Sequence, residues 1–244
     1  MAHRFWVAAE QLAGERVRFT DEQARQLQHV LRLRAGDEVR VFDGKTRVDR
    51  LVRLREDFEG LIVGEAPQAP EPRTCLVVYP ALLQRDKFEL VLQKLTELGV
   101  SAIAPVLTAR SLVREAPDER RVTRWRAILR EAAEQCGRGV VPELLPAAPL
   151  AKALENAAGR LVMASVSERC QALPAALADL PQQVALFVGP EGGFTPEEVR
   201  CAREAGASVV TLGPRVLRAE TAALLAAGLV LYELGDLWWP QSTT

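Results

Sequence analysis

Apolar and polar residues follow two different patterns along this chain of 244 residues. In the first part they alternate with a period of two, most clearly over residues 38–42, 47–54 and 60–63, which predicts β-strands. Thr20 and Gln23 have the spacing of a capping box, which predicts a short helix directly after Thr20. We expect this part of the chain to close into a compact β-barrel.

Beyond residue 65 the pattern changes. Three prolines within residues 66–72 predict a semi-rigid linker. From Thr74 onward, short apolar runs alternate with longer amphipathic segments, a pattern typical of a parallel sheet with helices on both faces. Strands are expected at 75–79, 102–106, 161–163, 184–188 and 208–212, and helices at 86–98, 117–136, 196–205 and 221–234.

The two patterns together predict an α/β protein of two domains. A small β-rich domain is expected over residues 1–70, and a larger domain with the parallel sheet over 73–244. The last helix is apolar on all sides, so we expect it to be buried on every side, by the core or by a partner.

Composition and charge exclude little. The net charge is -1. A content of 48% hydrophobic and 26% charged residues is ordinary for a globular protein. Residues 73–145 carry twelve basic and nine acidic side chains, an excess that suits a polyanionic partner but is also common in enzymes. The four cysteines and two histidines are widely spaced, so no metal site is expected. With no apolar run of membrane-spanning length and no signal peptide, a cytoplasmic protein is expected.

Two apolar strands each run into a glycine-proline loop. The strand at 184–188 leads into Gly189-Pro-Glu-Gly-Gly193, and the strand at 208–212 leads into Gly213-Pro214. The carboxyl ends of adjacent parallel strands are the usual place for a ligand in an open α/β sheet. The two loops therefore predict a cleft lined by main chain, with the alternative that each loop is only a tight turn.

The acidic residues near the first loop indicate the charge of the ligand. Glu191, Glu197 and Glu198 would repel a phosphate, and neither a P-loop lysine nor a GxGxxG motif is present. A neutral or cationic ligand that is bound mainly by backbone groups fits the loop better. S-adenosylmethionine, which carries a sulfonium cation and an adenine, meets that description.

Five motifs follow one another along the chain: His29-Val-Leu-Arg-Leu33 with Gly36-Asp37, then 93–100, 134–138, 189–194 and 212–221. Together they resemble the motifs of the RsmE family of 16S rRNA uridine-N3 methyltransferases, which belong to the SPOUT class. One position departs from the family pattern, because Ala109 stands where an acid usually precedes Arg110.

The resemblance implies a C-terminal trefoil-knotted SPOUT domain, an N-terminal PUA-like barrel that binds RNA, and a homodimer with its active site near the subunit interface. It also implies that the two loops hold S-adenosylmethionine, with glycines that allow close approach, apolar side chains around the adenine, and Glu191 accepting from hydroxyl or amino groups. The cofactor-binding residues expected on this basis are Gly189, Glu191, Gly192, Leu212, Gly213, Pro214, Val216, Leu217, Arg218 and Thr221.

Methylation at N3 of uracil requires removal of a proton or stabilisation of the anion that remains. Arg218, beside the second loop, is the first candidate to stabilise that anion, followed by Arg138 and Gln135. Glu220 and Glu97 are the carboxylates that could act as base, although Glu220 would serve equally well at the N-terminus of its helix.

Basic residues in both domains are expected to contact 16S rRNA in the small ribosomal subunit or its precursor. Lys87 and Lys94 lie seven residues apart, on one face of a predicted helix. The full set expected to bind RNA is Arg4, Arg32 and Arg34 in the barrel and Lys87, Lys94, Arg110 and Arg114 in the larger domain.

Two other functions stay open. A SPOUT enzyme could methylate a ribose 2′-OH or another base, and a catalytically inert assembly factor could bind RNA without a cofactor. The two intact glycine-proline loops favour an enzyme, because a protein that only binds RNA has no need for a cofactor cleft.

Overall fold

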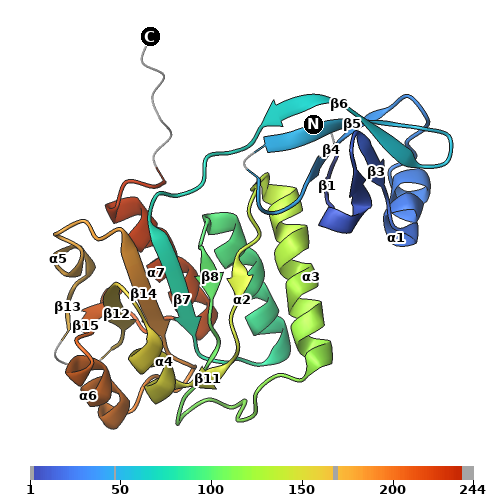
Figure 1. The fold of residues 1–244 in the computed structure, drawn as a ribbon. Coiled ribbons are helices and arrows are strands. Elements are labelled where there is room, and N and C mark those ends of the chain that lie inside the picture. Colours follow the sequence, from blue (N-terminus) through green and yellow to red (C-terminus); the bar gives the residue numbers. More distant parts are fainter. Residues whose placement is uncertain (1–2, 47, 167–169, 238–244) are drawn as a thin grey trace. The chain divides into compact units, whose positions relative to one another are not determined.

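The computed structural model describes residues 3–46, 48–166 and 170–237, and the chain divides into two compact units (Figure 1). The first unit contains the chain up to Glu71 together with Arg130–Val141, and the second contains Pro72–Leu129 and the chain from Pro142 onward. Residues 130–141 belong to the first unit, in which Arg4 donates to the carbonyl of Ala133 and the N–H of Trp6 donates to the carboxylate of Glu134. The domain boundaries expected at 1–70 and 73–244 stay a prediction.

The first unit is built around one curled sheet of six strands. Its order is β1-β4-β5-β6-β3-β2, with β1 parallel to β4 and every other neighbouring pair antiparallel. The expected β-rich fold is therefore confirmed, with the expected barrel present as a curled half-barrel. The beginning of the expected linker is still strand. The strands are β1 Arg4–Trp6, β2 Leu12–Ala13, β3 Arg16–Arg18, β4 Glu38–Phe42, β5 Val48–Leu54 and β6 Glu59–Pro67.

A short 3₁₀ turn, η1 Ala9–Gln11, precedes the one α-helix that begins in this sheet region, α1 Asp21–Arg25. Helix α1 starts at the expected capping box, in which the backbone N–H of Gln23 donates to Oγ1 of Thr20 at 3.2 Å. It continues as a π-helical turn, η2 Gln26–Val30. The sequence predicted the start of this helix but not the change to π geometry.

Arg4 lies in the interior of the first unit. Its Nε and Nη2 atoms each donate to the carboxylate of Asp49 at 2.7 Å, and Nη1 donates to the carbonyl of Ala133 at 2.9 Å. The guanidinium group also lies 3.8 Å from the ring centroid of Phe42. A contact of Arg4 with RNA, expected from the sequence, would therefore require this side chain to leave three partners in the interior.

The second unit contains a sheet of seven strands that are all parallel, in the order β10-β8-β7-β14-β12-β15-β13. A separate pair is formed by β9 Val106–Leu107 and β11 Ala148–Pro149. The single strand expected at 102–106 is thus divided, because Pro105 has no N–H to continue the ladder. The seven strands are β7 Cys75–Pro80, β8 Ala102–Ile103, β10 Glu143–Leu144, β12 Arg160–Ala164, β13 Gln171–Ala172, β14 Gln183–Val188 and β15 Ser208–Thr211.

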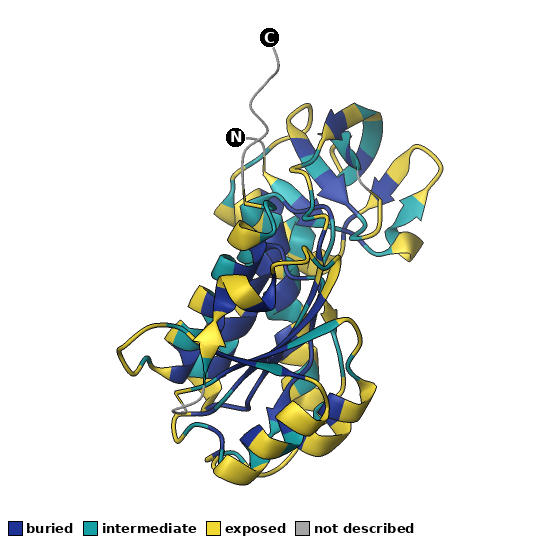
Figure 2. Ribbon diagram, turned by 90° about the vertical axis from the view of Figure 1, so that its left-hand side faces the viewer, coloured by how far each residue is buried: buried dark blue, intermediate teal, exposed yellow. Residues whose placement is uncertain are grey.

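Helices cover both faces of this sheet, as the sequence predicted (Figures 1 and 2). Successive residues of β14 point to opposite faces of the sheet. On one face, Ala185 and Phe187 pack with α4 Leu150–Asn156 and α6 Pro196–Glu204. On the opposite face α7 Ala219–Glu233 packs against β7, β14 and α2 Arg85–Leu98. The remaining helices are α3 Glu119–Cys136, which replaces the expected 117–136, and the short α5 Leu173–Ala176.

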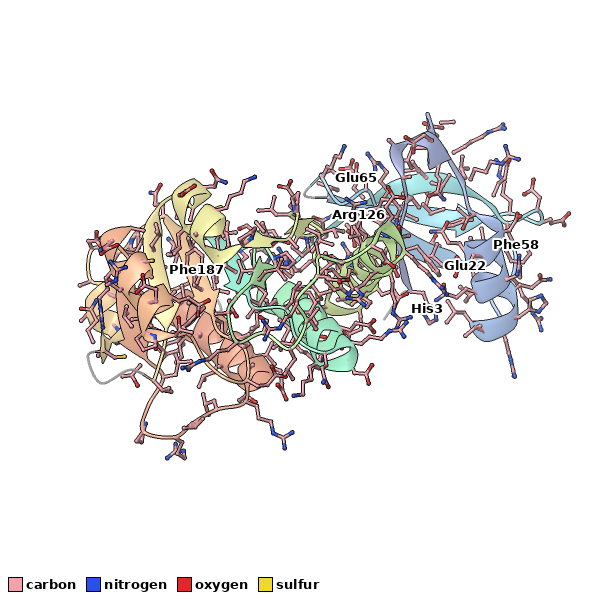
Figure 3. All side chains as sticks on the ribbon, turned by 90° about the horizontal axis from the view of Figure 1, so that it is seen from below. His3, Glu22, Phe58, Glu65, Arg126 and Phe187 are labelled. Carbon is pink, nitrogen blue, oxygen red and sulfur yellow. The ribbon has the colours of Figure 1, made fainter. Side chains whose placement is uncertain are left out.

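Two further features of the second unit follow local rules. Helix α6 begins at the expected capping box, with the N–H of Glu198 donating to Oγ1 of Thr195 at 3.1 Å. Phe187, labelled in Figure 3, stacks on Tyr79 with ring centroids 4.4 Å apart. In the described part of the chain, no helix combines the length and apolar character that a membrane span requires. The trefoil knot stays a prediction.

The Arg4–Asp49 pair yields a stability prediction. Replacing Arg4 by Met leaves the carboxylate of Asp49 buried without its cation, so we expect the free energy of unfolding to fall by about 3–5 kcal/mol. Urea unfolding measures the change. The double variant Arg4→Met/Asp49→Leu should recover much of the loss, and a double variant as unstable as the single one would contradict this account.

Candidate functional site

Three strands of the second unit end level with one another. Ala164, the last residue of β12, is paired with Val188 at the end of β14 on one side and with Val210 of β15 on the other. Because all three strands are parallel, the segments that follow them leave the sheet at the same edge. The two glycine-proline loops therefore lie side by side, as the sequence predicted.

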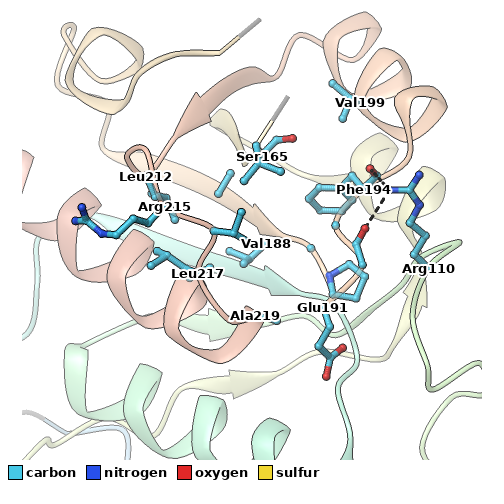
Figure 4. Close-up of a pocket in the computed structure, with 18 of the residues that line it drawn as sticks. Arg110, Ser165, Val188, Glu191, Phe194, Val199, Leu212, Arg215, Leu217 and Ala219 are labelled. Carbon is cyan, nitrogen blue, oxygen red and sulfur yellow. Dashed lines mark hydrogen bonds between the residues drawn. The ribbon is translucent and has the colours of Figure 1, made fainter. Parts of the chain in front are cut away.

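A cavity of about 660 Å³ lies at this edge (Figure 4), within the usual size range for a small-molecule site. Residues from the end of β12, both loops and the start of α7 line it. They are Arg110, Ala164, Ser165, Val166, Val188, Gly189, Pro190, Glu191, Gly192, Gly193, Phe194, Pro196, Val199, Arg203, Leu212, Gly213, Arg215, Val216, Leu217, Ala219 and Ala222.

The first loop is held by two cations from elsewhere in the unit. Nη1 of Arg110 donates to the carbonyl of Gly192 at 3.0 Å, the contact drawn in Figure 4, and Nζ of Lys87 donates to Oε1 of Glu191 at 2.9 Å. The backbone of Gly192 lies close to Arg110, since a Cβ atom at position 192 would be only 3.1 Å from Cβ of Arg110. The loop is thus held by side chains from outside it, and its contact with a ligand stays a prediction.

The Lys87–Glu191 ion pair changes the charge of the site. Burial alone would raise the pKa of Glu191, but the hydrogen bond from Lys87, a backbone N–H and the lysine charge together outweigh it. The pKa of Glu191 therefore lies below its ordinary value, and the carboxylate is ionised and paired at neutral pH.

The acidic surroundings inferred from the sequence are not what the structure has. Of the three carboxylates, only Glu191 lines the cavity. Glu197 forms an ion pair with Arg200, and Glu198 accepts from the N–H groups of Thr195 and Ala109 at 2.7 and 2.8 Å. Three arginines line the cavity as well, so repulsion by carboxylates does not exclude an anionic group on the ligand: Arg110, Arg203 and Arg215.

The second loop supplies an apolar wall. Leu212, Val216 and Leu217 line the cavity, with Leu212 and Leu217 drawn on one side of Val188 in Figure 4. Gly213 has a φ of 113°, a conformation that side-chain-bearing residues rarely adopt, and its N–H donates to Oγ1 of Thr211 at 3.2 Å. The loop can therefore turn sharply at Gly213 and expose its main chain to a ligand.

Seven of the ten residues expected to bind the cofactor line the cavity, namely Gly189, Glu191, Gly192, Leu212, Gly213, Val216 and Leu217. Pro214, Arg218 and Thr221 do not line it. Arg203 and Arg215 also line the cavity but were not predicted to do so. Arg203 lies in the last turn of α6 and Arg215 in the second loop, and neither kind of position indicates from sequence that a side chain faces a cavity. The individual roles stay predictions.

The four residues expected to act in catalysis lie in different places. Arg218 is the exposed N-cap residue of α7, between two residues that line the cavity. Glu220, in the first turn of α7, is 9% exposed, and its Oε2 atom is buried without a hydrogen-bond partner. Gln135 and Arg138 belong to the first unit, where Gln135 is exposed and the buried Arg138 donates to Glu71 at 2.6 Å.

The residues expected to bind RNA also separate into groups. Lys87 and Arg110 support the first loop. Lys94 donates to Glu97 at 2.7 Å, so the second candidate for the catalytic base already has a cationic partner. Arg32, Arg34 and Arg114 are exposed, whereas Arg4 is interior. The structure therefore gives three of these seven residues local partners at the surface of the second unit.

Comparisons with known proteins define the class first. Residues 70–231 match the family described as RNA methyltransferase domain, and residues 19–48 match the RNA methyltransferase PUA domain. The chain is 35% identical over 236 residues to ribosomal RNA small subunit methyltransferase E of Synechocystis sp., which covers 93% of this chain and 76% of that protein. This chain belongs to the ribosomal RNA small subunit methyltransferase E (RsmE) family.

Solved structures agree with this assignment. A ribosomal RNA small subunit methyltransferase E from Neisseria gonorrhoeae, bound to S-adenosyl methionine, is 33% identical with a TM-score of 0.87, over 98% of this chain and 100% of that one. A putative methyltransferase from Legionella pneumophila, in complex with the cofactor SAM, is 28% identical with a TM-score of 0.84, over 95% and 98% of the two chains.

The Lys87–Glu191 pair yields a pH prediction. Because the pKa of Glu191 is lowered on folding, the pair stabilises the folded state above the ordinary carboxyl range, and this stabilisation disappears as the pH falls through the lowered pKa. In Lys87→Met we expect a loss of about 0.5 kcal/mol at neutral pH, which vanishes in acid, together with a raised pKa of Glu191.

Carbon-detected NMR titration of the glutamate side chains and urea unfolding at several pH values measure both effects. Lys94→Met is the matched control, because it breaks an ion pair on the same helix that does not involve the loop. If Lys94→Met moved the pKa of Glu191 as much as Lys87→Met does, the direct contact would not be its cause.

Proposed function

We propose that this protein transfers a methyl group from S-adenosylmethionine to N3 of a uridine in 16S rRNA of the small ribosomal subunit. The observation that carries the proposal is the cavity between the two glycine-proline loops, at the level ends of β12, β14 and β15, in a chain of the RsmE family. The choice of uridine N3 and of 16S rRNA rests on the five motifs that resemble that family.

The residues at the cavity fit the proposed cofactor group by group. Leu212, Val216 and Leu217 offer apolar surface to the adenine, while the bare main chain at Gly213 offers N–H and C=O groups to its edge. Glu191 offers an acceptor to hydroxyl or amino groups. The three arginines that line the cavity suit the carboxylate of the methionine part of the cofactor.

When bound, S-adenosylmethionine supplies an electrophilic methyl group. The protein has to manage the negative charge that develops on uracil as N3 loses its proton. We assign the stabilisation of this charge to Arg218, whose neighbours on both sides line the cavity. Glu220 is the better candidate for the base, because its Oε2 has no hydrogen-bond partner whereas Glu97 is paired with Lys94.

The test of the function has two stages. Calorimetry of the purified protein with S-adenosylmethionine should give saturable binding, and mass mapping of 16S rRNA from a strain that lacks the gene should reveal one missing methyl group on a uridine base. Absence of saturable binding would favour the inert assembly factor. A missing ribose methyl group would favour the 2′-OH enzyme.

Arg218→Ala separates catalysis from binding within the same assay. We expect turnover to fall about 100-fold, as when one group that stabilises a developing anion is removed, with cofactor affinity nearly unchanged. Equal losses in turnover and cofactor affinity would mean that Arg218 serves to bind the cofactor.

We also propose that the protein is a homodimer that uses the outer face of α7. Leu225 is 38% and Tyr232 is 53% exposed, and together with the half-buried Ala222 and Leu229 they form a stripe at helical spacing. Light scattering should give the mass of two chains for the wild type and of one chain for Leu225→Glu. Val63→Glu, at an exposed apolar position of β6, is the control and should leave the mass unchanged.

A further inference from the structure

The first unit has a hollow of about 470 Å³ on its surface. Two segments far apart in sequence form it: the turn after η2 and the loop between β5 and β6, which contains Phe58, labelled in Figure 3. Besides Leu33, Ala35 and the phenyl ring, its lining consists of two arginines, one glutamine and one glutamate. The lining residues are Gln28, Arg32, Leu33, Arg34, Ala35, Glu56 and Phe58.

The backbone around this hollow is strained. Within the described part of the chain, three residues other than glycine have a positive φ, and two of them line the hollow: Arg32 at 56° and Phe58 at 54°. Such conformations cost on the order of 1 kcal/mol each and cluster at functional sites. The π-helical turn η2, which ends two residues before Arg32, is a second irregularity of the kind found at such sites.

Hydrogen bonds hold both strained segments in place. The N–H of Arg34 donates to Oδ2 of Asp37 at 2.7 Å, and the N–H of Leu33 donates to the carbonyl of Leu27 at 2.9 Å. On the other side, the N–H of Phe58 donates to the carbonyl of Arg55 at 3.1 Å. The two segments are therefore ordered turns, and the positive φ values are fixed features of the hollow.

The two arginines of the hollow have unused donors. Among the residues that the structure describes, the guanidinium groups of Arg32 and Arg34 have neither a hydrogen bond nor an ion pair, and both side chains are exposed. In the same unit, Arg4 and Arg138 are buried against carboxylates. Unpaired guanidinium groups beside an aromatic ring match the phosphate and the flat base of a nucleotide.

We propose that this hollow binds one unpaired nucleotide of RNA. The base lies against Phe58 with Glu56 as an acceptor for an N–H group on its edge, and Arg32 and Arg34 bind the adjoining phosphate. The nucleotide is unpaired because a base within a duplex has both faces stacked and cannot reach the ring. The proposal rests on the proposed function only in that RNA is the substrate, and it adds a second contact point, remote in sequence from the loops of the cofactor cavity.

The test measures the affinity of the full-length protein, without cofactor, for a fluorescein-labelled single-stranded RNA of twelve nucleotides and for the same sequence as a duplex. We expect Phe58→Leu to weaken single-strand binding about tenfold and to leave duplex binding unchanged. We expect Arg32→Ala/Arg34→Ala to weaken binding and to reduce the slope of log affinity against log salt by about 1–2.

Arg25→Ala is the matched control. Arg25 is an exposed arginine of α1 in the same unit that does not line the hollow. Its loss removes one positive charge, where the double variant removes two, and should leave single-strand affinity unchanged. Unchanged affinity in both hollow variants would overturn the proposal, as would an equal loss in Arg25→Ala. Since Phe58 also packs on the core of the unit, the exposed arginine pair decides the outcome if Phe58→Leu proves unstable.

Arg32→Gly tests whether the strain is kept for binding. Glycine adopts a positive φ without strain, so we expect the melting temperature to rise by about 2 °C while single-strand affinity falls. A rise with undiminished affinity would contradict the role of Arg32.

The outcomes also separate this proposal from the proposed function. If the wild type binds S-adenosylmethionine and methylates RNA while the hollow variants bind RNA normally, only the proposal about the hollow is refuted. If the hollow variants bind RNA more weakly but the wild type transfers no methyl group, only the proposed activity is refuted.

Discussion

The position of β12 between β14 and β15 is the constraint on which the site depends. Ala164 is level with Val188 on one side and with Val210 on the other, and all three strands run in the same direction. Two loops from different parts of the chain therefore emerge next to each other, and their main chains become opposite parts of one cavity. The hydrogen bonds of the sheet fix where each of these loops begins.

Charge plays a supporting role at this site. The loop that follows β14 is held by Lys87 from α2 and by Arg110 from the segment after β9. Both residues resemble RNA-binding cations when only the sequence is read. In the structure their donors are directed to a carboxylate and to a carbonyl of the loop, so the cations that position the cavity are drawn from the same pool as those that could contact RNA. Contact of Lys87 and Arg110 with RNA stays a prediction, as does contact of RNA with the arginines at the hollow of the first unit.

The first unit uses arginine in two contrasting ways. Arg4 is buried, with each of its three guanidinium nitrogens donating a hydrogen bond, and links β1 to β5 and to the carbonyl of Ala133. Arg32 and Arg34 are exposed beside Phe58 on a strained backbone. A buried pair such as Arg4–Asp49 contributes to a unique arrangement of strands, whereas exposed and unpaired guanidinium groups retain their full capacity to bind an anion.

The sequence by itself determined the features that depend on neighbours along the chain. The capping boxes at Thr20 and Thr195, the long strands and helices and the two glycine-proline loops all follow from local spacing. The family motifs predict that the loops bind the cofactor. The two-residue strands β2, β10, β11 and β13 were missed, because two residues cannot display a period. Helix α7 begins at Ala219 and not at Thr221, since the fold buries Ala219 and Glu220.

Only the tertiary structure decided which side chains meet. It assigned Arg4 to the interior, Lys87 to Glu191 and Arg138 to Glu71, and it brought Phe58 beside Arg32. The partners in these pairs lie far apart in sequence, so no local pattern links them. The physical reason is that burial and pairing of charges are properties of the folded arrangement, whereas strand, turn and cap preferences act over a few consecutive residues.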